Sequence, residues 1–315
     1  MSATPHPPIS VVVPVYNSEP TLAPLVERLT AVLTPLTSRL EIVLVNDGSR
    51  DGSWKAIEAL AAKAPQVRGL DLMRNFGQHN ALLAGIRAAE GEIIITLDDD
   101  LQNPPEEIPK LLEKLQPGVD VVYGCPEKAQ HGFLRNLASS MTKIVLQEGM
   151  GAEIARKVST YRAFRGLLRA AFADYRSPFL SIDVLLSWST SRFAAVDVRH
   201  EERAAGTSQY TLRKLVLHAL NMMTGFTTWP LRLASIIGLG LTFVGVFLMA
   251  FVLIRYFING GSVPGFPFLA ATICFFSGAQ LAALGVIGEY VSRVHFRLME
   301  RPTYAVRSTV GGTPG

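Results

Sequence analysis

Cysteine is scarce in this chain, and an N-terminal export signal is missing. Cys125 and Cys274 are the two cysteines among 315 residues, too few and too far apart for a metal knuckle or a disulfide framework. We expect both to be packing residues. The first residues contain three prolines and no apolar run behind a basic flank, so they lack the layout of a secretory signal. The domain that follows is therefore expected to stay in the cytoplasm.

Several ligand-binding fingerprints are also missing. The chain has neither the glycine fingerprint of dinucleotide-binding folds nor a P-loop, which removes support from hydride transfer and simple nucleotide hydrolysis. Three adjacent aspartates at 98–100 lack the glycine and the distant glutamate of an EF-hand calcium loop. Because no recognition motif combines basic residues with interleaved aromatic residues, we expect no nucleic-acid partner.

Charged residues make up only 18% of the chain, and the two signs are unevenly distributed. Residues 1–127 carry ten Lys and Arg against seventeen Asp and Glu, whereas residues 128–315 carry twenty against nine. The acidic first part suits a metal site. The basic second part suits an anionic partner, such as a phosphate or lipid headgroups.

Long apolar runs are present near the C-terminus. Twenty-two residues without a charge lie between Arg232 and Arg255, enough for a helix to cross a hydrocarbon core roughly 30 Å thick. A second uncharged run follows a break rich in glycine and proline. We therefore predict a hairpin of two transmembrane helices, at about 233–256 and 267–288.

Basic residues flank the outer ends of this predicted hairpin. The loop between the helices has only Arg255 at its edge, so both outer ends are expected to face the cytoplasm. Glu289 follows the second span and lies four positions before Arg293, the spacing of a helical ion pair. We expect this pair to lie at the membrane interface rather than in lipid.

The residues before the hairpin show alternating strand and helix patterns. Short β-branched runs are followed by segments whose apolar residues recur at helical spacing. Continuous apolar strands between amphipathic helices predict an α/β fold, a Rossmann-like, mostly parallel sheet with helices on both faces. The predicted strands are 9–16, 41–45, 67–72, 92–97 and 120–124, and the predicted helices begin after Thr21 and near 53, 78 and 105.

The three aspartates at 98–100 follow a predicted strand, at the sheet edge where parallel sheets bind ligands. Adjacent carboxylates repel one another unless a cation lies between them, and oxygen ligands suit Mg²⁺ or Mn²⁺ bridging to a diphosphate. In a strand-like extension Asp98 and Asp100 point the same way and can share one ion, with Gln102 next. The alternative is a solvated loop that caps the following helix.

Four segments resemble the family 2 glycosyltransferases with the GT-A fold: VVVPVYN, VNDGSRDGS, RNFGQHNALLAGI and LDDDLQNPPEEIP. The chain is most similar to the polyprenyl-phosphate branch, which includes dolichol-phosphate mannose synthases, bactoprenol glucosyltransferases and undecaprenyl-phosphate aminoarabinose transferases. The resemblance covers nearly the whole chain after the first eight residues, and LDDDLQNPPEEIP is its most specific part.

This resemblance implies a role for each matching residue. Asp98, Asp100 and Gln102 would hold Mg²⁺ or Mn²⁺ on the donor diphosphate, and Asp98, Asp100 and Arg135 would be the catalytic residues. The implied nucleotide contacts are Pro14, Tyr16, Asn17, Glu19, Asp47, Arg74, Gly77, Asp98 and Asp99, and the implied lid over the donor phosphates contains Arg203, Ser208 and Tyr210.

The acceptor side is expected on a helix at 133–147. Helical spacing places Arg135, Ser139 and Lys143 on one face, so the helix can lie in the membrane interface with its cations toward a phosphate. An ordinary amphipathic surface helix is the alternative. The resemblance favours a phosphate site, because Arg135 and Ser139 match the pair of residues with which the family binds the lipid phosphate.

The implied enzyme is an inverting, metal-dependent hexosyltransferase. It would move a sugar from a nucleotide sugar, which we expect to be UDP-glucose or a related UDP-hexose, to undecaprenyl or decaprenyl phosphate for cell-envelope glycans. The alternatives are a GDP-mannose-dependent polyprenyl-phosphate mannose synthase and an inactive membrane-bound sensor or scaffold. A processive polysaccharide synthase is disfavoured because its Gln-x-x-Arg-Trp motif is missing.

Four residues depart from the family's usual pattern: Asn46, Asp99, Arg156 and Gln209. They leave the reaction class intact, while the role of 156–165 and the choice of sugar stay open.

We expect four parts along the chain. They are a cytoplasmic GT-A domain at 1–200, a juxtamembrane amphipathic segment at 201–231, the transmembrane hairpin at 232–291 and a cytoplasmic basic tail at 292–315. The protein is thus expected to be a multi-pass protein of the inner (plasma) membrane with its catalytic domain in the cytoplasm. By resemblance we also expect a homo-oligomer, a tetramer.

Overall fold

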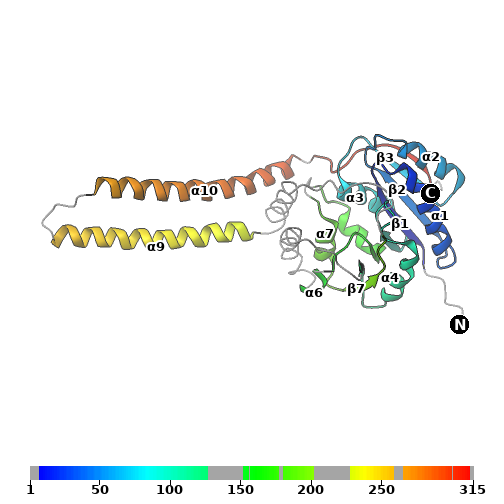
Figure 1. Cartoon of the computed structure of the whole chain (residues 1–315), viewed down its shortest axis with the longest axis horizontal. Helices are drawn as coiled ribbons and strands as arrows, with labels where there is room; N and C mark the ends of the chain where they lie inside the picture. Colours follow the sequence, from blue (N-terminus) through cyan, green and yellow to red (C-terminus); the bar gives the residue numbers. More distant parts are fainter. Residues whose placement is uncertain are drawn as a thin grey trace. The chain divides into compact units, whose positions relative to one another are not determined.

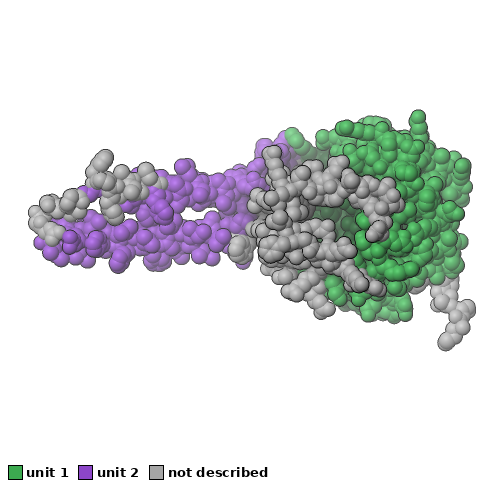
Figure 2. Space-filling model, viewed as in Figure 1, with its two compact units in different colours: residues 1–215, 300–315 green, residues 216–299 purple. Residues whose placement is uncertain are grey.

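The computed structural model describes residues 7–126, 152–155, 157–176, 180–201, 228–258, 265–299 and 301–312. The chain divides into two compact units, which Figure 2 shows in two colours. Unit 1 comprises residues 1–215 and 300–315, and unit 2 comprises residues 216–299. Unit 1 contains a β-sheet with its covering helices, and unit 2 contains two long helices (Figure 1).

Unit 1 is built on an eight-stranded sheet with the strand order β7-β5-β6-β4-β1-β2-β3-β8. Strands β6 and β8 run antiparallel to their neighbours, and the other strand pairs are parallel. The predicted mostly parallel sheet is therefore confirmed. The strands are β1 (Ile9–Val15), β2 (Leu40–Asn46), β3 (Val67–Leu72), β4 (Ile93–Thr96), β5 (Val121–Pro126), β6 (Arg162–Arg165), β7 (Phe193–Val198) and β8 (Val306–Gly311).

Helices cover both faces of this sheet, as the alternation of β1 side chains shows. Val11 and Val13 pack in one core with Leu22 and Leu25 of α1. Val12 points to the other face, where a Cβ added at Gly85 of α3 would come within 2.3 Å of it, so only glycine allows this close packing. The helices of unit 1 are α1 (Glu19–Leu33), α2 (Ser53–Lys63), α3 (Gln78–Ala88), η1 (Pro105–Glu107), α4 (Ile108–Lys114), α6 (Ala152–Ala155), η2 (Gly166–Phe172) and α7 (Ile182–Ser189).

Strand β8 lies within residues 292–315, where a cytoplasmic basic tail is expected from the sequence. It pairs with β3 in antiparallel register, with Leu70 opposite Thr309, and the register shifts between Asp71 and Leu72. In Figure 1 the described end of the chain, in red, lies beside β3 and α2. The chain thus returns to unit 1 after unit 2, and β8 forms one edge of the sheet.

Unit 2 consists of α9 (Trp229–Ile258) and α10 (Phe266–Leu298), which contain the two predicted spans. Among the described residues, one helix, Pro230–Ile258, is long and apolar enough to cross a membrane. Its large side chains are exposed in the single chain, with Phe257 at 80%. A membrane crossing by α9 is consistent with these observations, and a crossing by both helices stays a prediction.

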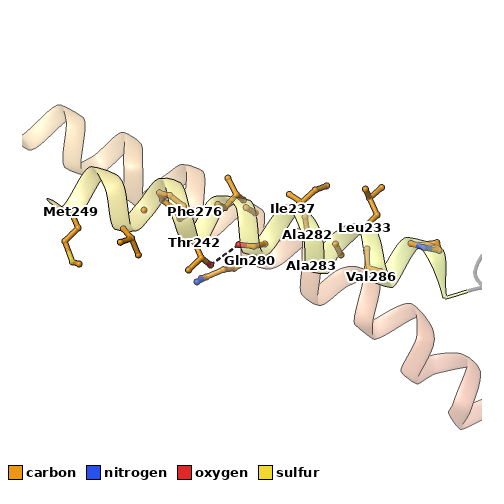
Figure 3. Close-up of a pocket in the computed structure, with 16 residues that line it drawn as sticks. Leu233, Ile237, Thr242, Met249, Phe276, Gln280, Ala282, Ala283 and Val286 are labelled. Atoms are coloured by element: carbon orange, nitrogen blue, oxygen red, sulfur yellow. Dashed lines mark hydrogen bonds between the residues drawn. The ribbon is translucent and has the colours of Figure 1, made fainter. Parts of the chain in front are cut away.

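The two helices of unit 2 pack against each other and leave a groove of about 740 Å³ between them. Thr242 of α9 and Gln280 of α10 are polar side chains in an otherwise apolar lining (Figure 3). The Thr242 hydroxyl donates to the carbonyl of Gly238 at 2.9 Å, so the helix backbone satisfies it. Toward the end of α10, Glu289 accepts from Arg293 at 2.7 Å, which confirms the ion pair predicted from their spacing.

Candidate active site

Unit 1 contains a cavity of about 270 Å³ at the carboxyl edge of the parallel strands. Four chain segments meet there: the end of β1, the residue after β2, the loop from β3 into α3, and the aspartates after β4. This is the edge at which open α/β sheets bind their ligands. The lining residues are Pro14, Val15, Tyr16, Asp47, Asn75, Gly77, Gln78, Asp98, Asp99 and Asp100.

The cavity brings together seven of the predicted donor-site residues. Pro14, Tyr16, Asp47 and Gly77 line it with the three adjacent aspartates at 98–100. The first of these, Pro14, and the last, Asp100, are 86 positions apart in the sequence, and the parallel register of β1 with β2 and β4 brings them to one edge. The observed arrangement agrees with the sequence-based expectation, while the role of each residue stays a prediction.

Asp47 connects the loop after β2 to the loop that enters α3 by hydrogen bonds. Its carboxylate accepts the backbone N–H of Phe76 at 2.7 Å and of Gly77 at 2.9 Å, and its exposed fraction is 3%. Burial raises the pKa of Asp47, against the opposing effect of the two hydrogen bonds. The loop that follows β2 and the loop that enters α3 are therefore held as one structure.

Gly48 lies at a close approach of these two loops. Its φ of +65° is in the left-handed region, and a Cβ added there would lie 2.5 Å from the backbone nitrogen of Asn75. That neighbour is main chain and cannot rotate away. Because Asn75 lines the cavity, any displacement of this backbone changes the shape of the candidate site.

Gly48→Ala is expected to lower the free energy of unfolding by about 2–3 kcal/mol and to weaken binding of the nucleotide expected in this cavity, because backbone strain and steric overlap act together. Gly118→Ala is the matched control, since Gly118 also has a positive φ, of +93°, but nothing lies within 4 Å of its added Cβ. Thermal unfolding and nucleotide titration of both variants measure the difference. Equal effects of the two substitutions would contradict this account of the loop contact.

The three aspartates at 98–100 each have a defined hydrogen-bond partner. Asp98 accepts from Gln78 Nε2 at 2.6 Å and from Thr160 Oγ1 at 2.6 Å, one donor on each oxygen. Asp99 accepts from the backbone N–H of Tyr16 at 3.1 Å, and Asp100 accepts from that of Gln102 at 3.2 Å.

Burial governs the acidity of Asp98 and Asp99. It raises the pKa of Asp98 and raises that of Asp99 to about 6, and the neighbouring carboxylates act in the same direction. A bound cation would offset both the cost of burying these carboxylates and their mutual repulsion. The cluster is therefore suited to a cationic ligand or to a metal ion that is bound together with an anionic substrate.

The backbone of this segment differs from the expectation in one respect. Strand β4 ends at Thr96, residues 99–100 form a turn and Leu101 has a φ of +62°, so no strand-like extension runs through the triplet. The prediction that strand alternation puts Asp98 and Asp100 on one side was therefore wrong, because this segment is not extended. The carboxylates nevertheless line one cavity, because the turn folds them toward the sheet edge.

A divalent ion fits this donor set only with further ligands. Among the residues that the structure describes, no three His, Cys, Asp or Glu side chains converge to hold a metal by themselves. Mg²⁺ commonly binds through one or two carboxylates and completes its shell with water and substrate phosphates. Asp98 and Asp100 can supply the carboxylates, so the arrangement fits an ion that is shared with a diphosphate.

Four predicted site residues do not line the cavity: Asn17, Glu19, Arg74 and Gln102. Asn17 Oδ1 accepts the backbone N–H of Arg50 at 2.8 Å, and Glu19 Oε2 accepts that of Gly52 at 3.0 Å, so both brace the loop after β2. The guanidinium of Arg74 lies 4.8 Å from the ring centroid of Phe76. The backbone carbonyl of Gln102 accepts from Glu201 at 2.9 Å.

Gln78 and Thr160 were not selected from the sequence, although both hold Asp98. Gln78 opens α3 within the segment RNFGQHN, and a glutamine that starts a helix beside a ligand loop is the signal that could have identified it. Thr160 lies 62 residues after Asp98 and two residues before the start of β6, and no local pattern connects Thr160 with Asp98.

The predicted acceptor residues Arg135, Ser139 and Lys143 lie outside the described residues, as do the predicted lid residues Arg203, Ser208 and Tyr210 and the departures Arg156 and Gln209.

Comparisons with known proteins agree with this geometry. Residues 10–176 match the family described as Glycosyl transferase family 2. The undecaprenyl-phosphate 4-deoxy-4-formamido-L-arabinose transferase of Shewanella sediminis is 36% identical over 307 residues, covering 96% of this chain and 93% of that protein. The protein of the same name from Serratia proteamaculans is 37% identical over 310 residues, covering 97% and 95%.

Solved structures show the same fold at low sequence identity. Mycobacterium tuberculosis glucosyl-3-phosphoglycerate synthase, in complex with Mn²⁺, UDP-glucose and phosphoglyceric acid, has a TM-score of 0.52 and 18% identity, covering 69% of this chain and 78% of that chain. The GT-A fold expected from the sequence is therefore confirmed. With the family match and the relatives along nearly its whole length, this chain is a glycosyltransferase and belongs to glycosyltransferase family 2.

Proposed function

We propose that this enzyme transfers a sugar from a nucleotide diphosphate sugar to the phosphate of a polyprenyl phosphate at the cytoplasmic face of a membrane. The observation that carries the proposal is the single cavity lined by Asp47, Gly77 and the three carboxylates at 98–100. It suits a diphosphate bound with Mg²⁺ or Mn²⁺, and relatives similar along their whole length are named for transfer to undecaprenyl phosphate.

The reaction is a direct displacement at the anomeric carbon. An oxygen of the lipid phosphate forms the new bond, the bond to the nucleotide diphosphate breaks, and the configuration inverts. The phosphate monoester has a second pKa of roughly 6, so it is largely ionised at neutral pH and needs no general base. When bound, the metal ion neutralises the charge that develops on the leaving diphosphate.

The acceptor would be held by residues outside those described. Arg135, Ser139 and Lys143 would bind the lipid phosphate, and Arg203, Ser208 and Tyr210 would close over the donor. Helices α9 and α10 would both cross the bilayer and keep the catalytic domain at the surface where the lipid phosphate is found. The assembly would be a homo-oligomer, a tetramer by resemblance.

A UDP-hexose, UDP-glucose in the first place, is the donor that we propose. The test incubates the full chain in lipid nanodiscs with undecaprenyl phosphate, Mg²⁺ or Mn²⁺, and single donors: UDP-hexoses, GDP-mannose, and a nucleotide-linked 4-deoxy-4-formamido-L-arabinose. Mass spectrometry of the extracted lipid identifies the sugar transferred.

Efficient transfer from one UDP-hexose is the expected result, and transfer from the 4-deoxy-4-formamido-L-arabinose donor alone would contradict the choice of a hexose. A lipid-linked mannose from GDP-mannose would instead support the mannose synthase. Nucleotide binding without transfer from any donor would support a sensor.

A further inference from the structure

The C-terminal segment contacts the loop that enters α3. The backbone N–H of Met73 donates to the carbonyl of Ala305 at 2.9 Å, and Arg307 Nη2 donates to the carbonyl of Met73 at 2.9 Å. Both main-chain polar groups of Met73 are thus bonded to residues that follow α10 by only a few positions. The loop 73–77 begins at this contact.

Arg307 also reaches a buried carboxylate. Its Nη1 lies 3.5 Å from Asp71 Oδ2, and the exposed fractions of the two side chains are 58% and 5%. The other oxygen of Asp71 accepts from Asn46 Nδ2 at 2.7 Å, and Asn46 Oδ1 accepts the backbone N–H of Ser49 at 3.2 Å. A continuous line of polar contacts therefore runs from β8 to the loop after β2.

This line gives a reason for one departure from the family's usual residues. An aspartate at position 46 would place a second carboxylate against the buried Asp71, which would cost stability unless one of them were protonated. Asn46 instead donates a hydrogen bond to Asp71, and Arg307 supplies the positive charge beside it.

The far end of the same loop is held by Asp47 through the N–H groups of Phe76 and Gly77. Asn75 lies between the two anchors and Gly77 belongs to the second, and both residues line the cavity. A third contact supports the tail, because the ring of Tyr304 lies 5.6 Å from the guanidinium of Arg87 on α3. The shape of one cavity wall thus depends on residues that follow unit 2 in the sequence.

We propose that β8 completes the donor pocket, with Arg307 as a positioning residue that holds loop 73–77 for the nucleotide diphosphate. The inference rests on the proposed function, because it takes this cavity as the donor site. Arg307 does not touch the reacting atoms. It acts through Asp71, Asn46 and the carbonyl of Met73.

If β8 had only a structural role, the expected effects of substitutions on nucleotide affinity would be different. Without β8, strand β3 would be an open edge, and covering an edge protects a sheet from pairing with other chains. If edge protection were its only role, substitutions along the strand would change stability alike and leave nucleotide affinity unchanged in the folded protein. Positioning by Arg307 predicts a loss of affinity that is specific to that side chain.

The test compares Arg307→Met, Arg307→Lys and Thr309→Val in the full-length chain. Thr309 is the matched control, because it lies on the same strand, is exposed, and pairs with Leu70 away from the loop. The measurements are the Kd of UDP and of GDP with Mn²⁺ by isothermal titration, the unfolding midpoint, and the donor KM and kcat for transfer.

Arg307→Met is expected to raise the nucleotide Kd and the donor KM about three- to tenfold, because the hydrogen bond to the Met73 carbonyl and the ion pair with Asp71 are both lost. Because the chemistry is untouched, kcat should stay within about twofold. The nucleotide Kd and donor KM of Arg307→Lys should lie between those of the wild type and those of Arg307→Met, since lysine keeps the charge but cannot make both contacts. Thr309→Val should bind as wild type does.

An unchanged Kd in folded Arg307→Met would overturn the inference and leave the proposed function standing. An equal loss of affinity in Thr309→Val would also overturn it and support edge protection alone. If the wild-type protein bound neither nucleotide diphosphate, the proposed function would fail, and this inference with it.

Discussion

Asp100→Ala is expected to reduce sugar transfer at least about a hundredfold, because a metal ion supplies several kcal/mol of charge stabilisation to a leaving diphosphate. Asp100 lines the cavity beside Asp98, and the substitution removes one of the two carboxylates available to the ion. The fold should survive, because Asp100 lies in the turn after β4 and its carboxylate accepts the backbone N–H of Gln102 within the same turn.

Mn²⁺ binding in the presence of UDP, followed by electron paramagnetic resonance, should weaken in parallel with the loss of transfer. Glu58→Ala is the control, because Glu58 is an exposed acid on α2, and its loss should change neither quantity. Full transfer by Asp100→Ala at limiting metal would contradict the assignment of this carboxylate to the metal.

Arg162→Met is expected to lower the free energy of unfolding by about 3–5 kcal/mol, because it leaves a buried carboxylate without its cation. The side chain of Arg162 has no exposed surface, and its guanidinium forms an ion pair with Asp183. Tyr123 donates to the same Asp183 oxygen at 3.0 Å. Burial alone would lower the pKa of the Arg162 guanidinium, but the neighbouring Asp183 carboxylate has the larger effect in total, so the pKa is raised. Thermal unfolding should show a midpoint lower by roughly 10 °C.

The double variant Arg162→Met/Asp183→Asn separates a lost charge pair from lost packing. Removing both charges should restore a large part of the stability, because a neutral amide can still accept from Tyr123. If the double variant were as unstable as the sum of the single variants, the ion pair would not be the cause.

Arg162 also links the buried core to the candidate site. Its Nε donates to Thr96 Oγ1 at 3.0 Å, and Thr96 Oγ1 donates to the carbonyl of Thr160 at 2.8 Å. Thr160 in turn holds Asp98. Arg162→Met should therefore reduce transfer below the level that the folded fraction explains.

The parallel part of the sheet could be predicted because its pattern is local. Each of β1 to β4 is a short apolar run with an amphipathic helix after it, and burial on both faces requires such runs. The meeting of polar residues at one edge followed from that topology. The triplet at 98–100 was expected at that edge for this reason and Asp47 was expected in the same site by resemblance, and all four residues line one cavity.

The antiparallel strands could not be predicted, because their sequences do not resemble buried strands. β6 is four residues long and contains Arg162 and Arg165, and a buried arginine is tolerated there only because Asp183 lies opposite. β8 alternates exposed and half-buried residues at a sheet edge and follows two long helices. Both strands depend on partners that are distant in sequence.

The finer geometry of the site escaped prediction for the same reason. The turn at 98–101 replaces the expected extension, and a positive φ at Leu101 has no signal in the sequence. The contacts of Asp98 with Gln78 and Thr160 join three elements. Residue types indicated the chemistry of the cavity, whereas the contacts that orient each carboxylate required the fold.

The most direct test of the central claim is the acceptor requirement. The full chain in nanodiscs is supplied with its nucleotide sugar, Mn²⁺, and either undecaprenyl phosphate or unphosphorylated undecaprenol, and both lipid mass and released nucleotide diphosphate are measured. The account predicts one hexose added per lipid phosphate, one nucleotide diphosphate released per transfer, and no product from undecaprenol. Transfer to undecaprenol, or no lipid product from a folded protein that binds the nucleotide sugar, would contradict it.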